Sequence, residues 1–303
     1  MGCWHRQPAP RYLLSRGIRS RRRQITVWKP MKLSAVGAVV LLALSSLRPD
    51  ATAQGMSLVD LAAAYGQQLL DACSNVIAEE HYTQQRSAPR GTRALRSDFV
   101  VVRYPGTNDW HVFRDVFEVD GNAIRDAAEE RLVKLFQRPA AEAIPRAHAI
   151  AAAAMKHNIQ DIGNLNNPLL ALSFLQKQLR ERFRFTAGSP ERKLGPTIRE
   201  IRFEEVRSPT LFRRGGNLDL PAHGVFWADE ETGRIVKMEL RLGGRGFAHS
   251  SMSWQPPSRI TTTFGKDERL GIDVPVEMRD HYPLDKVDVK GVATYSRFRR
   301  FSM

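Results

Sequence analysis

Motifs for catalysis and for cofactor binding are missing from this sequence of 303 residues. None of its eight histidines forms an H-E-x-x-H pattern, and there is no G-x-S-x-G, no P-loop and no dinucleotide fingerprint. Glu79, Glu80 and His81 are consecutive residues of types that bind metals, but a position at the polar end of a helix explains them without a metal. These absences predict a protein that is not an enzyme, with no catalytic residue, no bound metal and no cofactor.

Cysteine is scarce as well. The chain has two, Cys3 and Cys73, and only Cys73 lies beyond the N-terminal segment discussed below. A single remaining cysteine excludes a disulfide within the mature chain. Ala72, Val76 and Ile77 surround Cys73 with apolar neighbours, which is typical of a small buried side chain and not of a reactive thiol.

An export signal begins at Met31. Lys32 precedes an apolar run over residues 35–44, and Ala51-Thr52-Ala53 is a small-x-small cleavage triplet. The run is shorter than the roughly 20 residues that span a bilayer. We therefore expect residues 31–53 to be a signal peptide cut after Ala53, and the mature chain to be periplasmic or extracellular, with no transmembrane anchor. Residues 1–30 fit no such signal, and we interpret them as an extension foreign to the native product.

Most of the excess positive charge lies in that same segment. The chain has 46 Lys+Arg and 32 Asp+Glu, a net charge of +14. Residues 1–53 hold ten of the bases and one acid, which leaves 36 bases and 31 acids, or +5, for the rest. A charge of +14 would suggest nucleic acid as a partner. A charge of +5 on an exported domain does not, so no nucleic-acid partner is expected.

The mature chain, residues 54–303, shows a mixed pattern of helix and strand. Ser57 is a plausible N-cap for a helix whose apolar spacing continues to Ile77. Extended runs over residues 96–104 and 110–119 flank turn residues, and a helical insertion occupies about residues 120–180. From Arg182 onward the pattern is that of successive strands. The order predicts one α+β domain with an antiparallel sheet of about nine strands covered by helices.

The hairpin over residues 224–236 carries a family resemblance. Its sequence is Gly-Val-Phe-Trp-Ala-Asp-Glu-Glu-Thr-Gly-Arg-Ile-Val, an aromatic strand, a turn and an alternating strand. With the later strands it resembles the exported lipoprotein carriers of the LolA/LolB type over about residues 197–303. The resemblance implies an incomplete antiparallel barrel that curls round helices and leaves an apolar hollow for acyl chains.

Two hypotheses of function follow. In the first, the concave face of the sheet holds a lipid, an acyl chain or another hydrophobic ligand, since each buried methylene contributes about 0.8 kcal/mol. Apolar side chains of the expected strands form the candidate lining: Phe99, Val101, Phe203, Phe226, Met238 and Leu240.

In the second hypothesis, the chain is a structural or regulatory module that docks another protein of the cell envelope. An edge strand or the loop over residues 243–257 would make the contact. That loop carries three apolar side chains where loops are usually polar: Phe247, Met252 and Trp254. The same three residues could equally cover the core.

Overall fold

A computed structural model describes eight stretches of the chain, and residues Gln54–Met303 form one compact unit. The described residues are 56–104, 110–124, 129–159, 165, 167–214, 218–244, 257–284 and 287–301. The expected signal peptide and the loop that contains Phe247, Met252 and Trp254 lie outside these residues.

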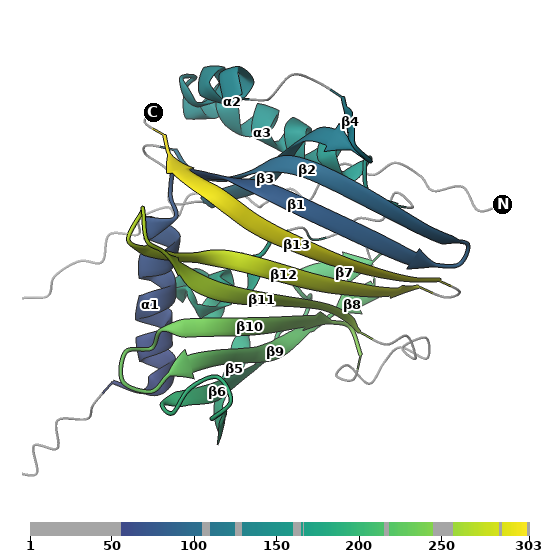
Figure 1. Cartoon of the computed structure of the whole chain (residues 1–303). Helices are drawn as coiled ribbons and strands as arrows, with labels where there is room; N and C mark the ends of the chain where they lie inside the picture. Colours follow the sequence, from purple (N-terminus) through teal and green to yellow (C-terminus); the bar gives the residue numbers. More distant parts are fainter. Residues whose placement is uncertain are drawn as a thin grey trace, which may run out of the picture. The chain divides into compact units, whose positions relative to one another are not determined.

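Antiparallel strands dominate the unit, which is therefore α+β as predicted (Figure 1). The described strands are β1 (Val76–Ser87), β2 (Arg90–Arg103), β3 (Trp110–Val119), β4 (Asn122–Ala123), β5 (Phe183–Pro190), β6 (Ile198–Glu205), β7 (Phe212–Arg214), β8 (Leu218–Leu220), β9 (Ala222–Asp229), β10 (Ile235–Leu242), β11 (Ser258–Asp267), β12 (Ile272–Leu284) and β13 (Val287–Arg300). The described helices are α1 (Leu58–Ala72), α2 (Glu129–Phe136), α3 (Ala140–Met155), the 3₁₀ helix η2 (Leu170–Leu175) and α4 (Lys177–Arg180).

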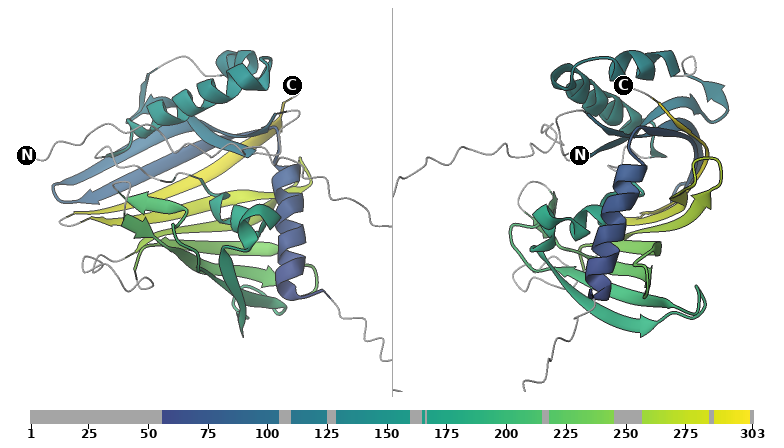
Figure 2. Two further views of the ribbon diagram at one scale, coloured as in Figure 1. Left: turned by 180° about the vertical axis from the view of Figure 1, so that it is seen from behind. Right: turned by 90° about the vertical axis from the view of Figure 1, so that its left-hand side faces the viewer.

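One sheet of 11 strands contains all the described strands except the pair β7–β8. Its order is β4-β3-β2-β1-β13-β12-β11-β10-β9-β6-β5. The estimate of about nine strands was too low, and the expected incomplete barrel is not found. The sheet stays open, because β4 and β5 are separate edges. It bends along its length, and α1 lies on the inside of the bend (Figure 2).

The two faces of the sheet carry different helices. Along β2, Phe99 and Val101 pack in the apolar cluster that includes α1 and η2, which we call the inner face. Their neighbours Val100 and Val102 pack with α2 and α3 on the outer face. Side chains alternate along a strand, so a strand covered on both faces is apolar at every position. This explains the unbroken run Phe99-Val100-Val101-Val102.

The first helix starts where the sequence predicts and ends earlier. Ser57 is the N-cap, and its Oγ accepts a hydrogen bond of 3.2 Å from the backbone N–H of Asp60. The helix ends at Ala72, because Asn75 takes a left-handed conformation with φ of 60° and turns the chain. Val76 and Ile77, expected in the helix, are instead the first residues of β1.

Candidate functional site

The six residues predicted to line a ligand site come together on the inner face. They are contributed by four strands, belong to one apolar cluster beneath α1 and η2, and are each at most 3% exposed. Phe99 and Val101 lie on β2, Phe203 on β6, Phe226 on β9, and Met238 and Leu240 on β10. The structure thus brings the six residues together on one side of the sheet. Their contact with a ligand stays a prediction.

Helix α1 is held on this face by a polar triangle. Arg234 donates two hydrogen bonds of 2.9 Å to Asp273, one to each carboxylate oxygen, and Tyr65 of α1 donates one of 2.5 Å to Oδ2. The pKa of Asp273 is lowered mainly by the hydrogen bonds from Arg234 and to a smaller extent by the hydrogen bond from Tyr65. Because a bidentate guanidinium–carboxylate pair fixes orientation as well as distance, this triangle sets the position of the helix on β10 and β12.

Gly233 lets α1 approach the hairpin between β9 and β10. Its φ is 72°, and a Cβ there would overlap the backbone carbonyl of Leu61 and lie 2.6 Å from the amide nitrogen of Ala62. At the other end of α1, the indole Nε1 of Trp110 donates to the backbone carbonyl of Leu70 at 3.1 Å. The turn Asp-Glu-Glu-Thr-Gly therefore also provides the surface on which the start of α1 packs.

A pocket of about 560 Å³ opens between α1, α4 and the edge strand β5. Its volume lies within the range of about 300–1,000 Å³ that is usual for small-molecule sites. Its apolar walls come from α1, η2 and β5: Ala63 of α1, Leu175 of η2, and Phe183 and Phe185 of β5. Arg184 lies on the other side of β5, where it pairs with Glu204 at 2.7 Å.

The pocket is continuous with the apolar cluster behind it. Leu175 and Phe183 belong to the same cluster as the six predicted residues. Aromatic rings lead inward from its wall: the ring centroid of Phe183 lies 6.0 Å from that of Phe203, and Phe203 lies 4.9 Å from Phe226. Two of the predicted residues therefore lie directly behind the pocket, which the sequence did not reveal.

Polar groups gather on one side of the pocket, from Gln176 to Glu181. Arg180 pairs with Asp60 at 2.6 Å, and Glu181 pairs with Arg207 at 3.4 Å. Lys177 is exposed and makes no ion pair with any described residue. The side-chain nitrogen of Gln176 is buried and has no hydrogen-bond partner within the described part of the chain.

A second cluster on the inner face is polar and fully buried. Glu80 accepts a hydrogen bond of 2.7 Å from Ser97 and one of 3.4 Å from Arg114. The guanidinium of Arg114 lies 4.8 Å from the ring centre of Tyr82, whose hydroxyl donates to Asp280 at 2.7 Å. These groups lie on β1, β2, β3 and β12, where an apolar core would otherwise continue.

Asp280 is the perturbed acid of this buried cluster. Burial, and then the negative charge of Glu80, raises the pKa of Asp280 from 3.8 to about 6, although hydrogen bonding from Tyr82 and the charge of Arg114 oppose the rise. Gly291 lies directly opposite on β13. A Cβ at Gly291 would overlap the carboxylate and lie 2.5 Å from the Tyr82 ring, so glycine there makes room for both.

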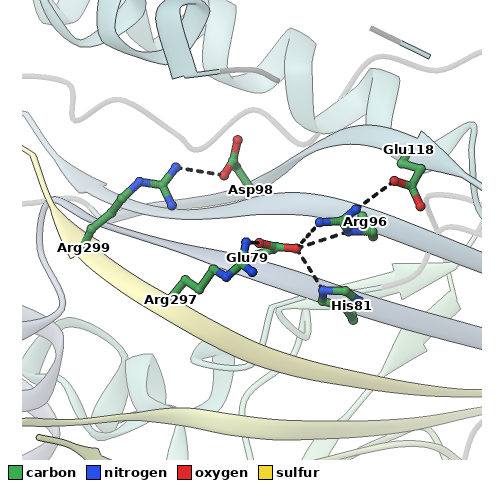
Figure 3. A network of polar contacts seen from close by, with 7 residues as sticks. All are labelled: Glu79, His81, Arg96, Asp98, Glu118, Arg297 and Arg299. Carbon is green, nitrogen blue, oxygen red and sulfur yellow. Dashed lines mark hydrogen bonds and ion pairs between the residues drawn. The ribbon is translucent and has the colours of Figure 1, made fainter. Parts of the chain in front are cut away.

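The outer face of the same strands carries an ionic network (Figure 3). Glu79 accepts hydrogen bonds from Arg96, from Arg297 at 2.9 Å and from His81 at 2.9 Å. Arg96 also reaches Glu118 at 2.9 Å, and Arg299 donates to Asp98 at 3.2 Å. The positive and negative side chains are balanced, as in a structural network.

Glu79, Glu80 and His81 cannot act together as ligands. Glu79 and His81 lie in the outer network, while Glu80 is in the buried cluster of the inner face. Among the described residues, no group of three or more histidine, cysteine, aspartate or glutamate side chains is arranged to hold a metal ion. No helix in the described ranges is long and apolar enough to cross a membrane.

Comparisons with known proteins find matches among solved structures alone. No protein-family model matches the sequence, and no curated protein matches it. An outer membrane lipoprotein-sorting protein domain from Vibrio parahaemolyticus matches with a TM-score of 0.40 and 11% identity, over 78% of this chain and 94% of the other. A LolA superfamily protein from Nitrosomonas europaea matches with a TM-score of 0.37 and 10% identity, over 79% and 94%. A DUF1329 family protein from Desulfovibrio piger gives a TM-score of 0.38 and 11% identity, over 81% and 94%.

The resemblance expected from residues 197–303 is thus confirmed as a fold-level match, at low sequence identity, to structures of LolA-superfamily and lipoprotein-sorting domains.

Proposed function

We propose that this protein is an exported, non-enzymatic binding protein that holds a hydrophobic ligand, such as a lipid or an acyl chain, on the inner face of its sheet. The observation that supports this best is the pocket beside α1, because its apolar walls continue into the buried cluster. A chain that enters between Ala63 and Phe185 would next meet Phe183 and the rings behind it.

Hydrophobic transfer supplies enough free energy for such binding. At about 0.8 kcal/mol per methylene, eight buried methylenes give roughly 6 kcal/mol before the costs of association. The sheet bends, and α1 lies on the inner side of the bend (Figure 2). The pocket lies between this helix and the β5 edge of the sheet. The six residues predicted from the sequence would form the inner wall of the ligand site.

Two tryptophan variants on one helix test this proposal. Ala63 lines the pocket, whereas its neighbour Ala64 is exposed. We expect Ala63→Trp to lower the affinity for dansyl-labelled undecanoate by at least about tenfold, the loss of roughly two buried methylenes, because the indole fills the pocket. Ala64→Trp should bind as the wild type does. Fluorescence titration measures both.

The control also separates blocking of the pocket from a general effect of tryptophan on α1. Equal affinities for the wild type and Ala63→Trp would contradict the proposal, as would a wild-type protein that takes up no probe. Circular dichroism of the two variants, compared with the wild type, establishes that both are folded at the temperature of the titration.

A further inference from the structure

The polar side of the pocket indicates what kind of head group the ligand carries. We infer that the pocket between α1, α4 and β5 takes a single-chain fatty carboxylate, with the carboxylate at Gln176 and Lys177 and the chain against Phe183 and Phe185. This inference rests on the proposed function and adds the chemical class of the ligand to it.

The side chain of Gln176 provides the first argument. Its Nε2 is buried without a hydrogen-bond partner among the described residues, while the residue lines the pocket. A buried donor left without an acceptor destabilises a protein, and a ligand oxygen that meets this side chain, turned toward the pocket, would remove that cost. Pure hydrocarbon would leave the donor as it is, so an oxygen-bearing head group fits better than an alkane.

Charge provides the second argument. The pocket is lined by two cations, Lys177 and Arg180, and by one acid, Glu181. Glu181 pairs with Arg207, and Arg180 pairs with Asp60 through Nη2, so the other N–H groups of Arg180 have no partner among the described residues. Lys177 has no ionic partner within the described ranges. The residual charge at this side is therefore positive and favours an anion with several acceptor oxygens.

The apolar walls fix the rest of the ligand. Phe183 and Phe185 project from the same face of β5, because side chains two residues apart share a face. Together with Leu175 and Ala63 they give an apolar surface next to the three donors. An anion with an alkyl chain satisfies both surfaces at once, whereas inorganic phosphate or acetate would contact only the polar side.

The test compares two ligands of equal chain length. Laurate and dodecanol differ only in the head group, and each is titrated as a competitor of dansyl undecanoate. We expect the wild-type protein to prefer laurate, and Lys177→Gln to reduce the laurate affinity by about 3- to 10-fold, since an exposed cation and its hydrogen bond to the carboxylate make only a modest contribution in water. Dodecanol should bind both proteins equally. Lys290→Gln, an exposed lysine on β13 far from the pocket, is the matched control.

Gln176→Leu gives an independent readout. Removal of a buried donor without a partner should leave the protein at least as stable in urea, yet weaken laurate binding by about threefold or more and leave dodecanol binding unchanged. A residue with only a structural role would not lower affinity for one head group alone.

The outcomes distinguish this inference from the proposed function. Equal affinity for laurate and dodecanol, unchanged in Lys177→Gln, would overturn the carboxylate site and leave hydrophobic binding in place. A protein that binds neither competitor would overturn both. Loss of laurate binding in Lys177→Gln but not in Lys290→Gln, with dodecanol binding unchanged, would support the inference.

Discussion

Asp280 gives the sharpest test of the buried polar cluster, through its effect on stability. The folded protein raises the pKa of this carboxyl from 3.8 to about 6, mainly by burial. A group whose pKa is raised on folding stabilises the native state fully below its unfolded pKa, and this contribution is lost as the pH rises through the folded pKa. The wild-type protein should therefore lose stability from this site between about pH 4 and pH 6.

The magnitude follows from the shift. Two pKa units at about 1.4 kcal/mol each correspond to about 3 kcal/mol. Asp280→Asn has no charge at any pH and keeps an acceptor for the hydroxyl of Tyr82. Its amide group adds a donor near Gly291, which costs a constant amount at every pH. The difference in unfolding free energy, Asp280→Asn minus wild type, should therefore rise by up to about 3 kcal/mol from pH 4 to pH 7.

Urea unfolding followed by tryptophan fluorescence, at a series of pH values, measures this difference. The ionisable groups that interact with Asp280, among them Glu80, Arg114, Tyr82 and Tyr282, are present in both proteins, so the comparison isolates the effect of the Asp280 carboxyl and its interactions. A difference that stays flat from pH 4 to pH 7 would refute the reasoning, because it would mean that the carboxyl ionises as easily in the folded protein as in the unfolded one.

Asp273→Asn is the matched control, with the opposite sign. Hydrogen bonds from Arg234 and Tyr65 lower the pKa of Asp273. Its stabilising contribution is therefore present above the unfolded pKa and lost as the pH falls through the folded pKa. The variant should be less stable than the wild type at pH 7, and this deficit should shrink below about pH 4. The same substitution at two sites thus gives opposite pH profiles.

Three glycine variants test the close approaches in the fold. Gly233→Ala should destabilise by about 2–5 kcal/mol in urea unfolding, because a strained φ of 72° adds to overlap with Leu61. Gly271 has φ of 68° and open space around it, so Gly271→Ala should lower the free energy of unfolding by only about 1–2 kcal/mol, from backbone strain alone. Equal losses in Gly233→Ala and Gly271→Ala would contradict the close packing of α1 on Gly233. Gly291→Ala should cost about 1–3 kcal/mol by crowding Asp280, and Asp280→Ala should relieve part of that loss in the double variant.

Much of the fold was accessible from the sequence because its pattern reflects burial. The hairpin expected over residues 224–236 lies in the structure, where β9 (Ala222–Asp229) and β10 (Ile235–Leu242) pair on either side of its turn. Ser57 was recognised as a cap, because Ser before an apolar-periodic run has a defined role at helix starts. Residues of one face, such as Met238 and Leu240, alternate along a strand with residues of the other face, and the structure brings the predicted lining together in one cluster.

Strand β1 escaped prediction for a physical reason. Its inner face carries Glu80, Tyr82 and Gln84, which are buried in a polar cluster, so the strand lacks the apolar alternation that marks a half-buried strand. The partners that make this burial tolerable, such as Arg114 and Asp280, are distant in the sequence. The pocket escaped for a similar reason, since Ala63 and Phe185 meet only in three dimensions.

The place of β13 in the sheet bears on how the chain folds. This strand lies between β1 and β12 and joins the half that begins at β4 to the half that ends at β5. Its pairing with β1 connects Val76 to Arg300, while the other neighbours of β1 and β12 in the sheet, β2 and β11, are next to them along the chain. Contacts of such long sequence separation form slowly, because a large loop must close first. During synthesis β13 emerges after every other described strand, so the edges of β1 and β12 that pair with it stay open until it arrives.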